Sequence, residues 1–387
     1  MAETKFKKIA LKDVHKATDN VEVFLFNVGQ GDHIMVKFPG LQYGIIDFYY
    51  DLELNLPEPP ALTYFKALRS ELSDSEFEQI NLAFFCISHT DKDHIKGIKQ
   101  TIEWFDLNGV FIEEFWFGAA REHAQLMDFL DTKINDFINN LPEKRHAELL
   151  NQKKFYNNNL RAFFRSFEKW KSKGFTSARY KNEATGMGEY LADVKPLRSP
   201  SADISAFNIG PLSIQLDDYY KNLTEDIVNK IICGDSSTAV DKNDMSHILC
   251  IKFGDKTLIF GGDTHREIWE TCLEHYHDPR YPYQKMFGGL KAHFVKVSHH
   301  GSKNSSSQTI WDTLLWRGSA SLLGISSGRN HKYKHPHSET IKDIRAIQAN
   351  SEIFPTNICN YCLHLLPHPK ELHTWYKDIK ADRKSVV

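Results

Sequence analysis

Two histidines and two carboxylates lie within six residues, because Asp91 and Asp93 stand between His89 and His94. Imidazole nitrogen and carboxylate oxygen are the usual protein ligands of zinc and related divalent metals. The spacing therefore predicts a metal-binding segment. The alternative explanation is a polar loop in which Asp93 caps the helix that follows.

Strand-like runs precede the residues that could do chemistry. The apolar run 82–87 leads into His89, the run 256–260 leads into Asp263, and the run 293–297 leads into His299 and His300. Buried strands that end in polar groups are common sites of catalysis in α/β proteins. When several such strand ends meet at one rim of a layered fold, they form a cleft.

The rest of the pattern predicts the elements around this cleft. Alternation and glycine turns predict an opening β-meander over 21–26, 34–38 and 43–47, and the helical spacing of Leu62, Phe65 and Leu68 predicts a helix over 61–72. Further strands are expected at 111–117, 247–253, 321–326 and about 358–365, and a helix is expected after His335-Pro336.

Five segments, in this order, resemble motifs of the metallo-β-lactamase fold: Asn27–Asp32, His89–His94, Phe260–Asp263, Lys296–Ser302 and His335–His337. The second is similar to the family's H-x-[HD]-x-D-H pattern. Its third position is Asp91, the form seen in the branch that resembles the hydrolase domain of the competence protein ComEC/Rec2. The resemblance implies an α/β fold, a four-layer αββα sandwich, in one domain over 1–387.

The resemblance also implies two divalent metal ions, Zn²⁺ or Mn²⁺. His89 and Asp91 would bind one ion, Asp93 and His94 the other, and Asp263 would bridge them. One of the neighbours His299 and His300 would complete the second site, and we favour His300. Four residues would orient these ligands: Asp32, Asp47, Asn243 and Ser246.

One histidine that many relatives use for the first metal is missing here. The corresponding stretch has the Asn-x-x-Ser pattern of the ComEC-like branch, matched by Asn243 and Ser246, and His247 is then an additional histidine. Because carboxylate-rich sites suit harder ions, manganese becomes more plausible than in an all-histidine site.

Two metals held about 3.5–4 Å apart activate water and stabilise the charge that builds up when a phosphodiester is attacked. Asp93 would lie beside the attacking hydroxide, and His335 would protonate the leaving oxygen. Phosphate binding is expected from a further set of residues: Lys296, Ser302, Lys303 and His337.

Apolar residues recur at helical spacing within residues 121–185, and this pattern predicts a two-helix insertion. Within it, residues 143–183 hold eleven Lys or Arg against four Glu, with aromatic residues between them. Such a surface can hold a phosphate backbone and stack bases, and Arg161, Arg165 and Lys169 are the candidate contacts. The alternative is an amphipathic helix pair with solvated lysines.

Composition is that of a soluble globular protein: 387 residues, 41% hydrophobic, 25% charged, with a net charge of −2. No apolar run is long enough to span a membrane and the N-terminus lacks an apolar signal core, so a cytoplasmic protein without membrane contact is expected. Cys359 and Cys362 have C-x-x-C spacing, but no second pair completes a zinc site.

These observations favour a metal-dependent phosphodiesterase, most of all a nuclease acting on DNA or RNA. A small-molecule phosphodiesterase is the second hypothesis; it would act on a cyclic nucleotide or a phosphocholine ester, with the insertion as a lid. The third is a catalytically weak binding module that meets a protein partner in a larger complex.

Overall fold

The computed structural model describes residues 20–39, 41–50, 56–89, 91–117, 190–192, 204–212, 215, 241–280, 284, 289–317, 321–328, 335–349 and 351–356. The predicted insertion over 121–185 lies outside these residues, and so do the predicted strand at about 358–365 and both cysteines of the C-x-x-C pair. Within the described part, no helix combines the length and the apolar character needed to cross a membrane.

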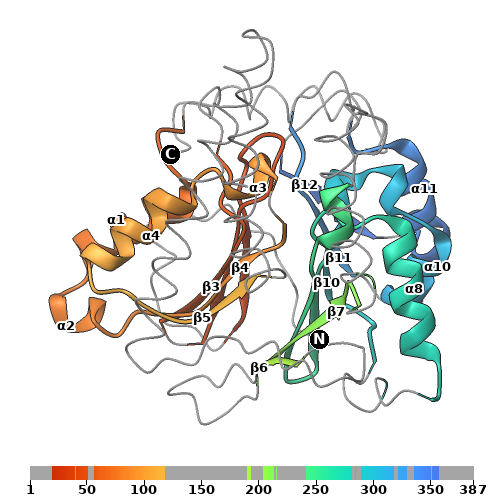
Figure 1. The fold of residues 1–387 in the computed structure, drawn as a ribbon, viewed down its shortest axis with the longest axis horizontal. Coiled ribbons are helices and arrows are strands. Elements are labelled where there is room, and N and C mark those ends of the chain that lie inside the picture. Colours follow the sequence, from red (N-terminus) through yellow and green to blue (C-terminus); the bar gives the residue numbers. More distant parts are fainter. Residues whose placement is uncertain are drawn as a thin grey trace, which may run out of the picture.

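Two β-sheets face each other in the middle of the molecule (Figure 1). The first has the order β1-β2-β3-β4-β5, with bounds Glu22–Leu25, Ile34–Phe38, Gln42–Ile46, Asn81–Ile87 and Phe111–Phe117. The second has the order β12-β11-β10-β9-β8-β7-β6. From β6 to β12 its bounds are Tyr190–Ala192, Ile204–Gly210, Ile248–Phe253, Lys256–Phe260, Phe294–Lys296, Leu322–Ile325 and Glu352–Pro355.

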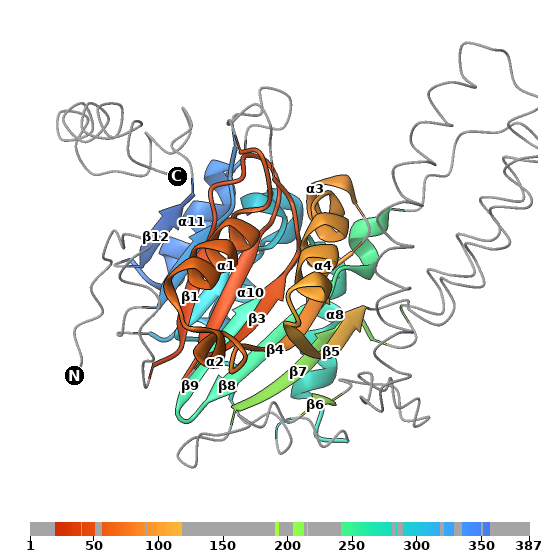
Figure 2. The same cartoon turned by 90° about the vertical axis from the view of Figure 1, so that its left-hand side faces the viewer.

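Helices cover the outer face of each sheet, as Figures 1 and 2 show. The first sheet carries α1 (Pro60–Glu71) and α4 (Ile98–Leu107), with the short α2 (Asp74–Phe77) beside them. The second carries α8 (Arg266–His277), α10 (Gln308–Leu314) and α11 (Ser338–Ile347). The apolar stripe of α4 illustrates the cause, since Ile98, Ile102 and Phe105 recur at helical spacing and are all buried.

Three apolar cores separate these layers. One joins the first sheet to its helices and includes Phe65 and Phe85, and another joins the second sheet to its helices around Trp269 and Trp311. The third, which includes Phe84, lies between the two sheets. Helices, sheet, sheet and helices therefore stack in four layers, which confirms the predicted αββα sandwich of the α/β class.

Both sheets follow the same plan, antiparallel at one end and parallel at the other. β1, β2 and β3 pair antiparallel, as the predicted meander requires, whereas β3, β4 and β5 pair parallel. In the second sheet β7, β8 and β9 are antiparallel, and β9 to β12 are parallel. Because parallel strands end at the same edge, the residues after β3, β4, β9, β10 and β11 gather at one rim.

A short helix, α3 (Lys92–Ile95), follows β4 and its polar segment. Its N-cap is Asp91, which makes no side-chain capping hydrogen bond. The alternative explanation of Asp93 as the helix cap is therefore wrong: Asp93 lies inside the first turn, where its carboxylate is available for other contacts.

Candidate metal centre

His94 is held in place by Asp47, the residue that follows β3. Its Nδ1 lies 2.7 Å from Asp47 Oδ2, and both side chains are fully buried. Asp47 also accepts hydrogen bonds from the backbone and the hydroxyl of Ser88, at 2.8 and 2.7 Å. A carboxylate that takes the Nδ1 proton of an imidazole leaves the Nε2 lone pair for a metal. Asp47 thus orients the His94 imidazole, and its role beside a bound metal stays a prediction.

His300 and His89 are oriented in the same way by oxygen atoms. His300 Nδ1 donates to the carbonyl oxygen of Ser326, just after β11, at 3.0 Å. His89 Nδ1 lies 3.1 Å from the hydroxyl of Ser88 and 3.3 Å from that of Ser246. Each imidazole is therefore anchored through Nδ1 and presents Nε2.

Asp263 is the carboxylate that these imidazoles face. Its Oδ2 lies 3.4 Å from Nε2 of His94 and 3.3 Å from Nε2 of His300. The Asp263 backbone N–H donates to Ser246 Oγ at 2.7 Å, which ties the end of β9 to the segment before β8. The preceding Gly262 has a φ of 50°, and a Cβ there would come within 2.3 Å of Ser246 Oγ, so this approach requires glycine.

The donor set fits divalent metals. Nε2 of His89, His94 and His300 and Oδ1 of Asp263 are buried, and none has a hydrogen-bond partner among the described residues. Buried polar atoms without partners are rare unless a ligand satisfies them. Three sets each bring one ligand atom per side chain within 4.8 Å of one another: His89, His94 and Asp263; Asp93, His94 and His300; Asp32, Asp47 and His94.

The pKa values show how negative this site is. Burial lowers the pKa of His300, but Asp263, Asp93 and Asp32 outweigh it and raise that pKa to about 10. Burial raises the pKa of Asp93, yet His300 and His94 hold it at about 2, so Asp93 is ionised at every physiological pH. A site that stabilises positive charge so strongly will also attract divalent cations.

The structure brings five of the predicted ligands together and leaves the other two outside the ligand sets described above. His89, Asp93, His94, Asp263 and His300 converge, with His94 and Asp263 shared between the two halves of the site. The implied division differs in one respect, because His89 is grouped with His94 and Asp263 rather than with Asp91. Between the neighbouring histidines, His300 is the one in the cluster, as we favoured.

Two predicted ligands lie outside these sets. Asp91 has a side chain that is 35% exposed, and its Oδ2 is 3.8 Å from His89 Nε2, at the edge of the site. His299 points elsewhere, with its ring 5.5 Å from that of His265 and 5.4 Å from that of His335. His299 and His300 both have positive φ, 49° and 53°, a strained backbone of the kind that proteins keep at functional sites.

Lys296 does not occupy the position that phosphate binding requires. Its side chain is fully buried and forms an ion pair with the buried Asp32, and its Nζ donates to the Gly262 carbonyl oxygen at 3.0 Å. Asp263 Oδ1 is 3.6 Å away. The predicted catalytic contact between Lys296 and substrate is therefore corrected: Lys296 is buried and holds Asp32 and Asp263 in place from within the protein.

Lys296→Met should destabilise the protein strongly, because the Asp32 carboxylate would remain buried without its cation. We expect a loss of about 3–5 kcal/mol in the free energy of unfolding, measured by urea denaturation with chelator present. The double variant Asp32→Asn, Lys296→Met should recover much of it. Lys256→Met removes an exposed lysine paired with Asp255 and should cost less than about 1 kcal/mol. A similar small cost for Lys296→Met would contradict the assignment.

The other residues predicted to contact substrate differ in burial and in hydrogen-bond partners. The Ser302 hydroxyl is buried and accepts from Asn304 N–H at 3.3 Å, which corrects its prediction as a phosphate ligand. Lys303 is exposed, and its backbone N–H donates to His337 Nδ1 at 3.0 Å. Arg161, Arg165 and Lys169 lie outside the described residues.

His335 lies beside the cluster, with its ring 6.1 Å from that of His300 and its Nδ1 3.4 Å from Gln30 Nε2. Burial, His300 and His299 lower the pKa of His335 to about 3. Its imidazole is therefore neutral near pH 7. This disagrees with the predicted role as proton donor and favours a neutral N–H that binds an oxygen.

Sequence reasoning missed Ser88 and His265. Ser88 contacts Asp47, His89 and His94, and its position directly after a buried strand was the available signal. His265 packs against His299 and bonds Asp244 through Nδ1 at 3.0 Å. Asn243 of the Asn-x-x-Ser stretch is buried, and His247, which follows the stretch, is buried outside the three ligand sets.

No family model matches the chain. One segment is similar to ComE operon protein 3 of Bacillus subtilis (strain 168), with 25% identity over 118 residues, which cover 30% of this chain and only 13% of that protein. The crystal structure of YhfI from Bacillus subtilis, a metallo-β-lactamase fold protein, matches 86% of this chain and 94% of its own at 10% identity and a TM-score of 0.36.

Because that TM-score is low, the fold assignment depends on the four layers and on the rim where the strand ends meet. The imidazole and carboxylate atoms at the rim that lack a hydrogen-bond partner among the described residues would fit divalent ions. The four-layer αββα architecture is the one that the motifs' resemblance to the metallo-β-lactamase fold implies, and one segment of the chain is similar to ComE operon protein 3.

Proposed function

We propose that this protein is a metal-dependent phosphodiesterase that hydrolyses DNA or RNA. The observation that carries the proposal is the convergence of three buried Nε2 atoms on Asp263, while each Nδ1 is anchored to an oxygen. Two divalent ions, Zn²⁺ or Mn²⁺, would activate a water molecule and neutralise phosphate charge there. No serine or cysteine nucleophile is needed for such a reaction.

The chain's own residues then have separate tasks. Asp47, Ser88 and Ser246 fix the orientation of His94 and His89, and Ser326 fixes that of His300. The Asp93 carboxylate is ionised and partly exposed, so it can accept a hydrogen bond from the attacking water. The neutral His335 can donate its N–H to a phosphate oxygen.

Nucleic acid is the proposed substrate for two reasons. The motif pattern with Asp91 is that of the ComEC-like branch, and the composition of residues 143–183 is basic and aromatic. Arg161, Arg165 and Lys169 are the proposed contacts to the phosphate backbone. A protein partner in a larger system remains compatible with the proposal.

The test is a reconstitution assay. Protein stripped by a chelator is reloaded with Mn²⁺ or Zn²⁺ and assayed on plasmid, single-stranded DNA, RNA and bis(4-nitrophenyl) phosphate. We expect ion-dependent cleavage of a polynucleotide that chelator abolishes. Hydrolysis of the small diester alone would favour a small-molecule phosphodiesterase. Metal binding without any hydrolysis would favour a binding module.

A further inference from the structure

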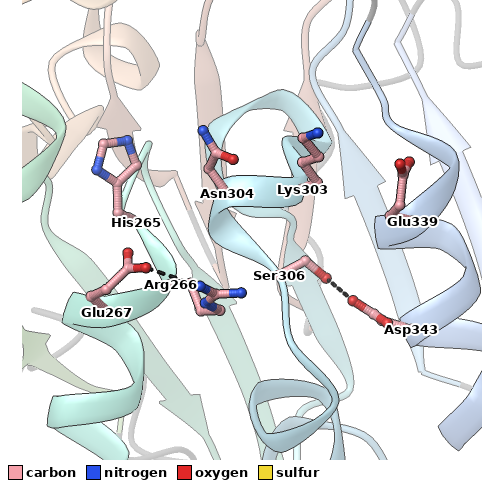
Figure 3. A pocket seen from close by; sticks show the side chains of 8 residues that line it. All are labelled: His265, Arg266, Glu267, Lys303, Asn304, Ser306, Glu339 and Asp343. Atoms are coloured by element: carbon pink, nitrogen blue, oxygen red, sulfur yellow. Dashed lines mark hydrogen bonds and ion pairs between the residues drawn. The ribbon is translucent and has the colours of Figure 1, made fainter.

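A polar pocket of about 500 Å³ lies beside the candidate metal centre (Figure 3). It is formed where α8 and α11 begin, on either side of the short 3-10 helix η5 (Lys303–Ser305), which contacts both. Every residue that lines it is polar: His265, Arg266, Glu267, Lys303, Asn304, Ser306, Glu339 and Asp343. Such a lining suits a hydrophilic ligand rather than an apolar one.

Two contacts connect this pocket to the metal centre. His265 is at one side, and its ring packs 5.5 Å from that of His299. On the other side the Lys303 backbone N–H donates to His337, whose ring lies 4.8 Å from that of His335. A group in the pocket would therefore belong to the part of a substrate next to the reacting phosphate.

The carboxylates of the pocket are engaged by neighbours. Glu267 accepts from Arg266 at 3.1 Å, and Asp343 accepts from Ser306 at 2.9 Å. Glu339 accepts from the hydroxyl of Ser338 at 3.0 Å. Arg266 thus offsets the charge of Glu267, whereas the hydroxyl donors orient Glu339 and Asp343 but leave them negative, so the cation of Lys303 is needed to attract an anion.

Two side chains of η5, those of Lys303 and Asn304, offer donors that the described residues do not use. Figure 3 shows His265, Asn304, Lys303 and Glu339 along one side of the pocket, with the Arg266–Glu267 and Ser306–Asp343 pairs on the other. The side chains of Lys303 and Asn304 are exposed and make no hydrogen bond or ion pair to the described residues; the Lys303 charge acts only at a distance, on Glu339. An ammonium and an amide side by side are a common combination of phosphate donors.

We propose that Lys303 and Asn304 bind the phosphate of the nucleotide next to the cleaved diester. This inference depends on the proposed phosphodiesterase function and narrows its substrate to an extended polynucleotide. A cyclic nucleotide has no neighbouring phosphate to place there. A phosphocholine ester would need aromatic rings to hold its quaternary ammonium, and the pocket has none except the imidazole of His265.

The experiment compares Lys303→Gln and Asn304→Ala with wild type on two substrates, an oligonucleotide and bis(4-nitrophenyl) phosphate, in the metal-loaded protein. The quantity of interest is the ratio of the two kcat/KM values. Loss of a charge-assisted hydrogen bond should lower the ratio by about tenfold in Lys303→Gln. In Lys303→Gln, which removes a cation, the salt dependence of oligonucleotide kcat/KM should also become shallower, by about 0.7–0.9 in the log–log slope.

Lys256→Gln is the matched control, because Lys256 is an exposed lysine at the start of β9 and not part of the site. Its ratio and its salt slope should equal those of wild type. If the Lys303 and Asn304 variants also keep both, or if they slow the two substrates equally, the neighbouring-phosphate site is refuted while the phosphodiesterase stands. If wild-type protein hydrolyses neither substrate, the proposed function fails and the inference fails with it.

Discussion

Asp263→Ala is expected to remove most of the bound metal, and hydrolysis with it. Asp263 Oδ2 lies between Nε2 of His94 and Nε2 of His300, at 3.4 and 3.3 Å, so this carboxylate is common to both halves of the cluster. Without it two imidazoles lose the negative charge that attracts a cation. We expect the metal content of protein purified without chelator to fall from about two equivalents to less than one.

Elemental analysis measures the content, and the reconstitution assay measures the activity. Asp263→Asn keeps the shape of the side chain and tests the same point if the alanine variant does not fold. The matched control is Asp255→Ala, whose carboxylate is 82% exposed on the turn between β8 and β9. Full metal content in both Asp263 variants would show that Asp263 is not a shared ligand.

The second large effect is expected from Asp93→Asn. The substitution keeps the size of the side chain and one oxygen, but it removes a negative charge that His300 and His94 hold ionised, with a pKa of about 2. Its Oδ2 lies 3.8 Å from His300 Nε2, at the exposed side of the cluster. Loss of a positioned acceptor for the attacking water should lower kcat by about 10²–10⁴-fold.

Stability provides the internal control for this variant. Because Asp93→Asn removes the charge that pairs with His300 but the side chain is 36% exposed, the melting temperature with chelator present should fall only modestly, and Asp255→Asn should change neither rate nor melting temperature. A folded Asp93→Asn protein that has lost activity supports the catalytic assignment. Activity near that of wild type would remove Asp93 from the reaction and leave it as a polar residue in the first turn of α3.

Local patterns in the sequence determined most of the fold. Apolar runs bounded by glycine predicted strands such as β2 at 34–38 and β5 at 111–117 with the observed bounds. The helix expected over 61–72 is α1, at Pro60–Glu71. These predictions succeed because side-chain periodicity and turn chemistry are properties of neighbouring residues. The order of the motifs then predicted the four layers.

The sequence also determined which residue types meet at the rim, because the ends of parallel strands must share an edge. Only the tertiary structure decided how they divide the work. Lys296 and Ser302 have the chemistry of phosphate ligands, but both are buried and bind other residues of the protein instead of a substrate. The choice of His300 over His299 depends on two consecutive residues with positive φ, which send neighbouring imidazoles in different directions.

The pocket beside the centre was beyond the reach of sequence reasoning for the same physical reason. His265, Lys303 and Glu339 are separated by dozens of residues and share no pattern, and they meet because α8, η5 and α11 pack against one another. The sequence by itself determined the fold and the chemical types of the ligands, which follow from local spacing. The tertiary structure decided which atoms remain unpartnered, because burial and long-range contacts exist only in the folded chain.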